Sequence, residues 1–542
     1  MGFLIVVVKQ DCVRRFSIYL GGLLCLFVLG FSCTAIRADP RTPVVEIASG
    51  KLAGVVLEQS TGLTVFRGVP YAAPPVGDLR WRPPRPAANW AGLRVCDKFS
   101  SIAWQRRKSD SSMSEDCLYL NIWTTGIGKA DKLPVMVWIH GGGLNKGWGH
   151  IPMYDGSQFA RHGVVLVSIN YRLGPLGYLA HPGLSAESDQ GVSGNYGFLD
   201  QIQSLKWVQQ NIGAFGGDPT NVTIFGESAG GTSVAVLTVS PLARGLFHRA
   251  ILQSPWMFGY TSSLAEPNTI DLKRPTRSFA SAEVLGDRWA KRFVEGEGQE
   301  AISQLRKITA KQLIETGSSN TRVTVDGWLL PGRPVELFAQ GKQADVPMMI
   351  GTTKDEGNYF IQYVGSKSRK QFEEKLRGFY GTGGEQVASL YRGETVKELT
   401  AAGSLFCTDS WFLQPSRQML QGMCQLKSPA YQYLFARPSK RYPYLGAPHA
   451  VELVYVFDTL DAKKASDRDR KLARTMNQYW IQFARTGNPN ADGLPAWPAY
   501  TQQNHQYLVL DHEISQDAGL RDEACDVLDR AQQRVYQQPI KR

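Results

Sequence analysis

A series of short, continuous apolar runs constrains the fold of this chain more than any other feature. The runs cover residues 134–139, 164–169, 222–225, 249–252 and 347–350. Strands that are apolar on both faces belong to a parallel sheet that helices cover on either side. Residues 199–212, between two of the runs, carry apolar side chains at helical spacing. This alternation predicts an α/β fold with a mostly parallel, twisted central sheet and right-handed crossovers.

The pattern along the chain predicts one large domain over residues 39–542, although 542 residues would allow several. Residues 44–47 and 52–57 alternate apolar and polar side chains around Ser49-Gly50, which predicts an N-terminal hairpin. Residues 261–345 and 365–430 are more polar and helix-like. We interpret these two stretches as helical excursions from the sheet that could cover a site.

The first 38 residues have the pattern of a targeting segment. Arg14 and Arg15 precede an apolar run over residues 18–31, which is too short for a comfortable membrane span, and Ala38 marks the expected cleavage point. Two other routes stay open, because residues 14–18 weakly match a twin-arginine signal and Cys33 is a poor but possible lipid-attachment site. We expect export to the periplasm or the medium, with no membrane span in the mature chain.

The charge balance is basic but not clustered. The formal net charge is +12, and the densest basic cluster is only Arg106-Arg107-Lys108. Three residues do not make a nucleic-acid footprint, so we expect no nucleic-acid partner. A basic surface could attract anionic substrates, but the simpler interpretation is a folded enzyme with a high isoelectric point.

Gly226-Glu227-Ser228-Ala229-Gly230 follows the run 222–225 and precedes a helix of small residues. Such a sharp turn strains the serine backbone and crowds the residues two positions away, which glycine permits. It would hold Ser228 at the carboxyl end of a strand and at a helix N-terminus, where open α/β sheets bind ligands and developing negative charge is favoured. The pattern alone is common by chance, but in this context it predicts a nucleophile elbow.

A second glycine-rich motif, His140-Gly141-Gly142-Gly143, follows the run 134–139. Loops of this kind donate backbone N–H groups to an oxyanion, and the expected donors here are Gly142, Gly143 and Ala229. The alternative is an ordinary flexible turn. A serine hydroxyl is a poor nucleophile at neutral pH, so Ser228 also needs a base, and the base needs an acid that orients it.

Several motifs together resemble the type-B carboxylesterase and cholinesterase family of the α/β-hydrolase superfamily. They are residues 66–71, 114–122, 170–174, 215–219 and 226–231. The resemblance covers essentially the whole mature chain, which is identified as a secreted member of the bacterial type. It implies a single α/β-hydrolase domain, hydrolysis of small carboxylic esters through an acyl-serine, and no metal or organic cofactor. The oligomeric state is not implied.

The resemblance also implies the rest of a catalytic triad. Glu356, in the motif Asp355-Glu356-Gly357, matches the orienting acid, and Asp355 is the alternative. His449, within residues 446–453, matches the base, and the order Ser, Glu, His suits an α/β-hydrolase. We interpret the other histidines, His140 included, as structural or surface residues.

Further roles follow from the same comparison. Ser254 and Asp409 resemble positions that support the histidine from behind, although either could be a turn or capping residue. Glu227, beside the nucleophile, could favour cationic groups. Without the leader an odd number of cysteines is left, which suggests disulfides and one free thiol. The resemblance implies that Cys96 pairs with Cys117, and it leaves the other three unassigned: Cys407, Cys424 and Cys525.

Alternative functions within and outside the enzymes stay open. The chain could be a lipase, an amidase, or a specialised hydrolase of bulky or polycarboxylic esters. A non-enzymatic binding relative would have lost the nucleophile, and Ser228, Glu356 and His449 are all present.

Overall fold

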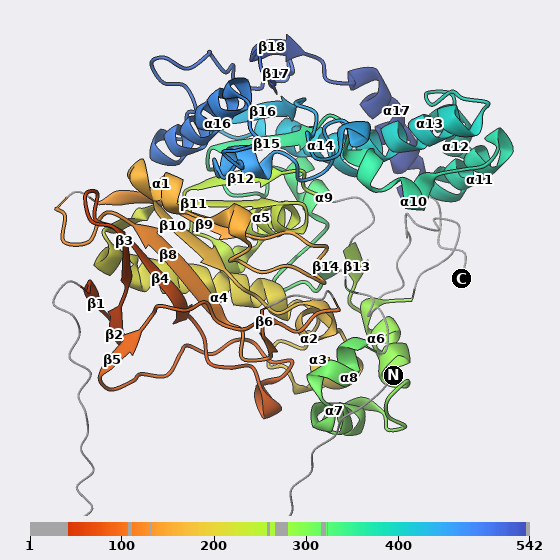
Figure 1. The fold of residues 1–542 in the computed structure, drawn as a ribbon. Helices are drawn as coiled ribbons and strands as arrows, with labels where there is room; N and C mark the ends of the chain where they lie inside the picture. The colour runs from red at the N-terminus through yellow and green to blue at the C-terminus, as the bar shows by residue number, and fades with distance from the viewer. Residues whose placement is uncertain are drawn as a thin grey trace, which may run out of the picture. The chain divides into compact units, whose positions relative to one another are not determined.

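An 11-stranded sheet organises the part of the chain that the structure describes (Figure 1). The computed structural model describes residues 42–106, 111–130, 132–256, 261–265, 280–315, 321 and 323–537. The predicted targeting segment with Cys33, and Arg107 and Lys108 of the basic cluster, lie outside these residues. The described residues belong to one compact unit that begins at Thr42.

The middle of the sheet is parallel. Its strands, in spatial order, are β10 (Val165–Ile169), β9 (Leu133–Ile139), β11 (Gly217–Glu227), β12 (Arg249–Gln253), β15 (Met348–Thr353), β16 (Ala430–Phe435) and β17 (Gln506–Leu510). Antiparallel strands complete both edges: β8 (Tyr119–Thr124), β4 (Leu63–Pro70) and β3 (Val55–Glu58) on one side, and β18 (Ser515–Ala518) on the other. All five apolar runs are parallel strands, which confirms the predicted fold class.

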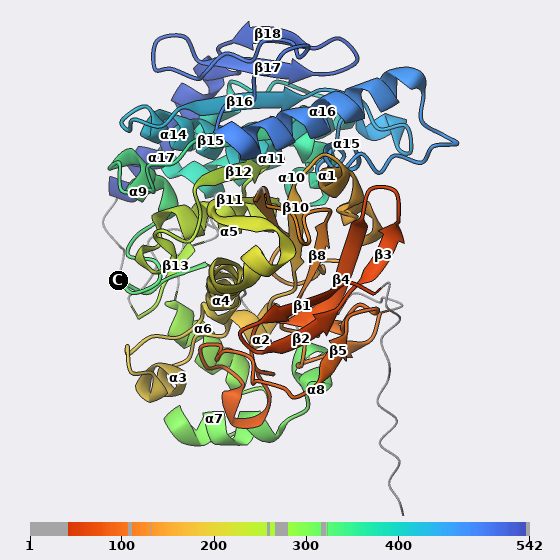
Figure 2. The same cartoon turned by 90° about the vertical axis from the view of Figure 1, so that its left-hand side faces the viewer.

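Both faces of the sheet are buried, as the continuous apolar runs predict. In β9, Val135 and Val137 belong to one buried cluster, while Met136 and Trp138 belong to the cluster on the opposite face. The first cluster includes residues of α4 (Tyr196–Asn211), α5 (Ala229–Val239), α9 (Pro334–Ala339) and α14 (Gln414–Met423). The second includes residues of α1 (Ser157–Arg161), α15 (Leu453–Val456) and α16 (Asp467–Thr486), and α16 lies across the sheet in Figure 2.

The N-terminal hairpin is present but shorter than predicted. Strand β1 (Val44–Ile47) pairs antiparallel with β2 (Gly50–Ala53), which also pairs with β5 (Leu93–Val95). The expected second strand breaks at Gly54, where a Cβ would lie 2.8 Å from the ring of Phe66. The chain beyond this close contact becomes β3 and joins the large sheet.

The two polar stretches form mainly helices, as predicted. The first contains α6 (Ala282–Ala290), α7 (Gly298–Lys307), α8 (Ala310–Glu315) and β14 (Val323–Val325), which pairs with β13 (Thr261–Ser263). The second contains α11 (Arg369–Tyr380), α12 (Gly384–Ala388), α13 (Val396–Cys407) and a π-helical turn over Thr408–Leu413. Other elements are the β6 (Ile102–Ala103) and β7 (Met113–Ser114) pair, α2 (Gly174–Tyr178), α3 (Pro182–Glu187), α10 (Ile361–Val364) and α17 (Asp522–Gln537).

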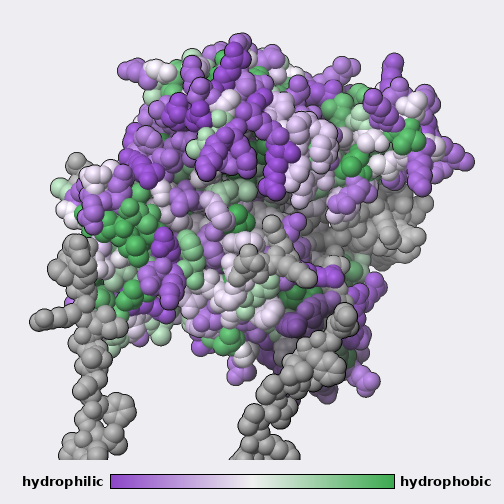
Figure 3. Space-filling model, viewed as in Figure 1, coloured by the Kyte–Doolittle hydropathy of each residue, from purple (hydrophilic) through white to green (hydrophobic). Residues whose placement is uncertain are grey.

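The helices that the structure describes were compared with what a membrane span requires. Within the described ranges, none of the helices combines the length and the apolar character needed to cross a membrane. On the face drawn in Figure 3, hydrophilic residues predominate and hydrophobic residues gather in separate patches. Separate patches of this kind are usual for a folded protein.

The implied Cys96–Cys117 disulfide is not formed, because both residues are free cysteines in the structure. The Sγ atom of Cys96 points to the carbonyl oxygen of Arg94 at 3.9 Å. Burial raises the pKa of Cys96 to about 12 and raises the pKa of Cys117, which is buried near Asp200 and Arg172, well above its usual value. A thiol with a raised pKa carries less thiolate, which is the nucleophilic form in disulfide chemistry. Cys407, Cys424 and Cys525 are free as well.

Candidate active site

Ser228 lies at a strained turn between β11 and α5. Its backbone angles are φ 56° and ψ −122°, a region that residues with a side chain rarely adopt. Its amide donates to the carbonyl oxygen of Gln253 at 2.9 Å, which ties the turn to β12. A Cβ on Gly230 would lie 2.0 Å from the carbonyl oxygen of Ile139. The turn therefore has the geometry expected of the elbow, and the flanking glycine is required by a backbone contact.

The glycine-rich loop after β9 packs against this turn. A Cβ on Gly141 would lie 2.7 Å from the carbonyl oxygen of Glu227 and 3.1 Å from the Cβ of Ser228. Gly142 and Gly143 have φ values of 112° and 66°, which allow the loop to turn sharply here. Ala229 is the first residue of α5, so its N–H has no partner within the helix. The three expected oxyanion donors thus come from two loops in contact.

His140 has the structural role expected from the sequence. Its ring stacks on Tyr171 with centroids 4.4 Å apart, and its Nδ1 lies 2.8 Å from the carbonyl oxygen of Gly141. Burial lowers the pKa of His140 to about 4, so the ring is neutral near pH 7. It supports the glycine loop from behind.

Glu356 and His449 form a buried pair. Nδ1 of His449 lies 2.5 Å from Oε2 of Glu356, and Glu356 is fully buried at the end of β15. The other oxygen of Glu356 accepts from the hydroxyl of Ser254 at 2.5 Å and from the amide of Thr353 at 2.8 Å. The alternative acid, Asp355, instead accepts from the amide of Ala447. The arrangement assigns the contact with the imidazole to Glu356.

Ser254 and Asp409 differ in what they contact. Ser254 touches Glu356, as the comparison of sequences suggested. Asp409, which we expected behind the histidine, instead accepts from the hydroxyl of Tyr391 at 2.9 Å and pairs with Arg521 at 2.5 Å. It lies in the π-helical turn Thr408–Leu413, whose Phe412 packs on the imidazole, and its partner Arg521 precedes α17. Asp409 therefore joins two elements through its own contacts, and a supporting role for the histidine stays a prediction.

Two more carboxylates surround the imidazole. Oε1 of Glu227 lies 3.0 Å from Nε2 of His449, a charge contact whose alignment does not make a hydrogen bond. Glu452 is fully buried and accepts from Gln253 at 3.1 Å. Glu452 was not predicted from the sequence, although it lies only three residues after His449.

The three acids change the titration of the base. Burial lowers the pKa of His449, but the charges of Glu227 and Glu356 outweigh it and raise that pKa to about 9. Burial raises the pKa of both Glu227 and Glu452. Neighbouring groups of this kind gain and lose protons as a set.

The hydroxyl of Ser228 is the least constrained part of the constellation. Ser228 is 7 % exposed, and its side chain has no hydrogen-bond partner among the residues that the structure describes. Nε2 of His449, the atom that would accept its proton, faces Glu227. Glu356 and His449 are thus already in contact, whereas Nε2 of His449 faces Glu227 rather than Ser228.

Aromatic rings pack around the imidazole. Phe360 and Phe412 have ring centroids 5.0 Å from that of His449, and Tyr359 lies at 6.1 Å. Phe360 continues to the stacked pair Trp256 and Trp411. Sequence reasoning missed these rings, because they come from separate segments. They add apolar contacts to an imidazole that carboxylates also surround.

A serine at a strained strand–helix turn, glycine-loop amides and an imidazole–carboxylate pair define a serine hydrolase of the α/β type. Residues 41–528 match the model of the carboxylesterase family. The chain belongs to this family and is an ester hydrolase.

Known esterases are similar to this chain over nearly its whole length. The chain is 35 % identical to fumonisin B1 esterase of Sphingopyxis macrogoltabida over 514 residues, covering 91 % of each protein. It is 34 % identical to para-nitrobenzyl esterase of Bacillus subtilis, covering 87 % of this chain and 95 % of that protein. The solved structure of a PNB esterase superimposes with a TM-score of 0.75 at 32 % identity, over 90 % of this chain and 99 % of the other. These matches show the α/β-hydrolase fold.

Proposed function

We propose that this esterase works through Ser228 as nucleophile, His449 as general base and Glu356 as the acid that orients the imidazole. The 2.5 Å contact between His449 Nδ1 and Glu356 Oε2, beside the strained Ser228, carries the proposal. Such a carboxylate holds the imidazole in the tautomer that accepts a proton at Nε2, and it stabilises the imidazolium that forms.

Each catalytic step then has a named atom. The Ser228 Oγ attacks the ester carbonyl carbon while its proton passes to His449 Nε2, which gives a tetrahedral oxyanion. The amides of Gly142, Gly143 and Ala229 stabilise that oxyanion, and each donor of this type contributes about 10²–10³ in rate. The imidazolium protonates the departing alkoxide. Water then attacks the acyl-serine by the same route and releases the acid.

The contact between His449 Nε2 and Glu227 must be exchanged for one with Ser228 before proton transfer. Catalytic hydrogen bonds are often loose in a free enzyme and tighten when substrate binds. A serine side chain turns about one bond, and Ser228 directly follows Glu227. We propose that bound ester completes this exchange.

The surroundings of the base favour neutral esters with apolar groups. Phe360, Phe412 and Tyr359 border the imidazole, and the charged groups that contact it or act on its pKa are the carboxylates of Glu227, Glu356 and Glu452. These carboxylates would repel a polycarboxylic acyl group, so we favour apolar esters over that alternative. We expect a higher kcat/KM for an apolar aryl ester than for an ester of equal length that ends in a carboxylate. Equal or reversed values would overturn this preference.

We also propose that residues 1–38 direct export. The match to the family covers residues 41–528, so residues 1–38 lie outside the region shared with the family. Fractionation of producing cells and N-terminal sequencing of the mature protein would test this. Cytoplasmic protein that keeps its leader would contradict it, while Cys33→Ser and a double lysine replacement of Arg14 and Arg15 would separate the possible routes.

The test of the mechanism is the variant Ser228→Ala with a chromogenic ester. We expect a loss of about 10⁶-fold in kcat, as seen when a catalytic serine is removed elsewhere. An organophosphonate should label the unmodified protein on Ser228, which peptide mass spectrometry would locate. Ser389→Ala, at an exposed position directly after α12, should keep near-normal activity. Retained activity in Ser228→Ala, or labelling of another residue, would refute the assignment.

A further inference from the structure

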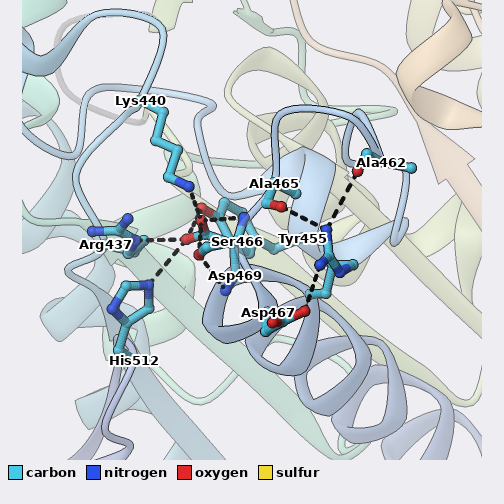
Figure 4. A network of polar contacts seen from close by, with 10 residues as sticks. Arg437, Lys440, Tyr455, Ala462, Ala465, Ser466, Asp467, Asp469 and His512 are labelled. Carbon is cyan, nitrogen blue, oxygen red and sulfur yellow. Dashed lines mark hydrogen bonds and ion pairs between the residues drawn. The ribbon is translucent and has the colours of Figure 1, made fainter.

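One buried carboxylate contacts the chain on both sides of His449 (Figure 4). Asp469, at the start of α16, is 1 % exposed. Before the histidine, Arg437 Nε donates to its Oδ1 at 2.8 Å and Lys440 Nζ lies 2.6 Å from its Oδ2. After the histidine, the hydroxyl of Tyr455 donates to Oδ1 at 3.3 Å. The segment that carries the base is therefore held at both ends by the same side chain.

The carboxylate is itself firmly held. Ser466 and Asp469 form a capping box at the start of α16, in which the Ser466 hydroxyl donates to Oδ2 at 2.5 Å. Nε2 of His512, just after β17, lies 3.0 Å from Oδ1. Burial raises the pKa of Asp469, but bonds from Lys440, Ser466 and Arg437 outweigh it and hold that pKa far below its usual range. Asp469 is thus an ionised anchor at any working pH.

The segment between the anchors is strained next to the base. Ala450, the neighbour of His449, has φ 68°, a conformation that is unfavourable for a residue with a side chain. The amide of Ser439 donates to the carbonyl oxygen of Gly446 at 2.7 Å, and Ala447 is tied to Asp355. Strained backbone persists only where its surroundings over-determine it.

We propose that Asp469 is a positioning residue for catalysis, which holds the His449 segment through Arg437 and Lys440 on one side and Tyr455 on the other. The inference rests on the proposed role of His449 as base. Freed from this anchor, the segment relaxes at Ala450 and the imidazole moves away from Glu356. A displacement of about 1 Å at a reacting group can cost about 10²-fold in rate.

The test compares Asp469→Asn with the milder Lys440→Met and Tyr455→Phe, using kcat and KM for a neutral ester. We expect kcat to fall about 10- to 100-fold in Asp469→Asn and less in the milder variants, with KM nearly unchanged. Asp467→Asn is the matched control. Asp467 lies on the same helical turn and is 96 % exposed, and it pairs with Arg470 rather than with the histidine segment (Figure 4).

The pH profile separates positioning from a general loss of stability. An imidazole that moves away from Glu356 loses part of the effect that raises its pKa, so the acid limb of kcat/KM moves to lower pH in Asp469→Asn. The low-field proton resonance of His449 Nδ1 should broaden or vanish in the same variant. Lys440→Met and Tyr455→Phe, which keep the anchor itself, should show smaller shifts in the same direction.

The outcomes distinguish this inference from the proposed function. Full activity in His449→Ala would overturn the role of the base, and the positioning role with it. If His449→Ala is inactive while folded Asp469→Asn and Lys440→Met match Asp467→Asn in kcat and pH profile, only the positioning role is wrong. If Asp469→Asn does not fold, the same comparison made with Lys440→Met and Tyr455→Phe decides the matter.

Discussion

The nucleophile turn and the histidine segment reach the same site by different means. The turn at Ser228 is packed against backbone, since a Cβ on Gly226 or Gly230 would lie 2.6 Å or less from backbone atoms that include the carbonyl oxygen of Ile139. The histidine segment is held by polar side chains, among them Asp355 and Asp469. Steric exclusion by the backbone shapes the turn at Ser228, whereas polar contacts hold the segment of His449. We expect the two regions to fail in different ways when altered.

Among the variants of the histidine region, Glu356→Gln should cause the largest loss of activity. The amide removes the charge that selects the imidazole tautomer, so we expect kcat to fall about 10⁴-fold with the fold intact. Steady-state kinetics and circular dichroism check both points. Asp355→Asn alters only the loop contact with Ala447, so it should lower kcat far less. If Glu356→Gln loses less than tenfold, the orienting role passes to Asp355.

Gly230→Ala should lower the stability of the protein as well as the rate of hydrolysis, because it alters the turn at Ser228. The added Cβ would lie 2.0 Å from the carbonyl oxygen of Ile139, so the backbone must move. We expect the free energy of unfolding, measured in urea, to fall by about 3 kcal/mol. Gly378→Ala is the control, because it lies within α11 with open space around it and should gain about 0.5–1 kcal/mol. Equal stability of the two variants would contradict steric placement of Ser228.

Ser254→Ala should weaken the histidine side by an intermediate amount. It removes the hydroxyl that donates to Oε1 of the buried Glu356. A hydrogen bond to a charged group contributes about 1.5–3 kcal/mol, so we expect kcat to fall about tenfold or somewhat more. Ser254→Thr keeps the hydroxyl and should restore part of the rate. A kcat unchanged in Ser254→Ala would show that the amide of Thr353 suffices.

Glu227→Gln tests how the two regions interact, because Glu227 belongs to the turn at Ser228 and faces His449. The base must be neutral to accept a proton, so activity rises with pH through the pKa of His449, which lies above its usual value. Removing one carboxylate lowers that pKa, and the acid limb of kcat/KM should move to lower pH by about one unit or more. Profiles from acid to alkaline pH would show the shift. An unmoved limb would contradict a charged Glu227 beside His449.

The sequence predicted the parallel strands at the centre of the sheet, but it did not predict all the strands that belong to the sheet. Residues 134–139 and 222–225 are apolar on both faces, so they could only be covered strands. Strand β16 was missed, since its residues Ala-Tyr-Gln-Tyr-Leu-Phe include a buried glutamine that a pattern reads as exposed. The break at Gly54 depends on the ring of Phe66, which lies in another strand.

Within the site, motifs determined the elbow, the glycine loop and the choice of Glu356 and His449, because each depends on neighbours a few residues away or on a family pattern. Only the tertiary structure decided that Cys96 and Cys117 are free, that Asp409 pairs with Arg521, and that Glu227, Glu452 and the aromatic rings surround the imidazole. The reason is physical. Local backbone geometry follows from adjacent residues. The charge, burial and contacts around a side chain depend instead on segments that meet only after the chain has folded.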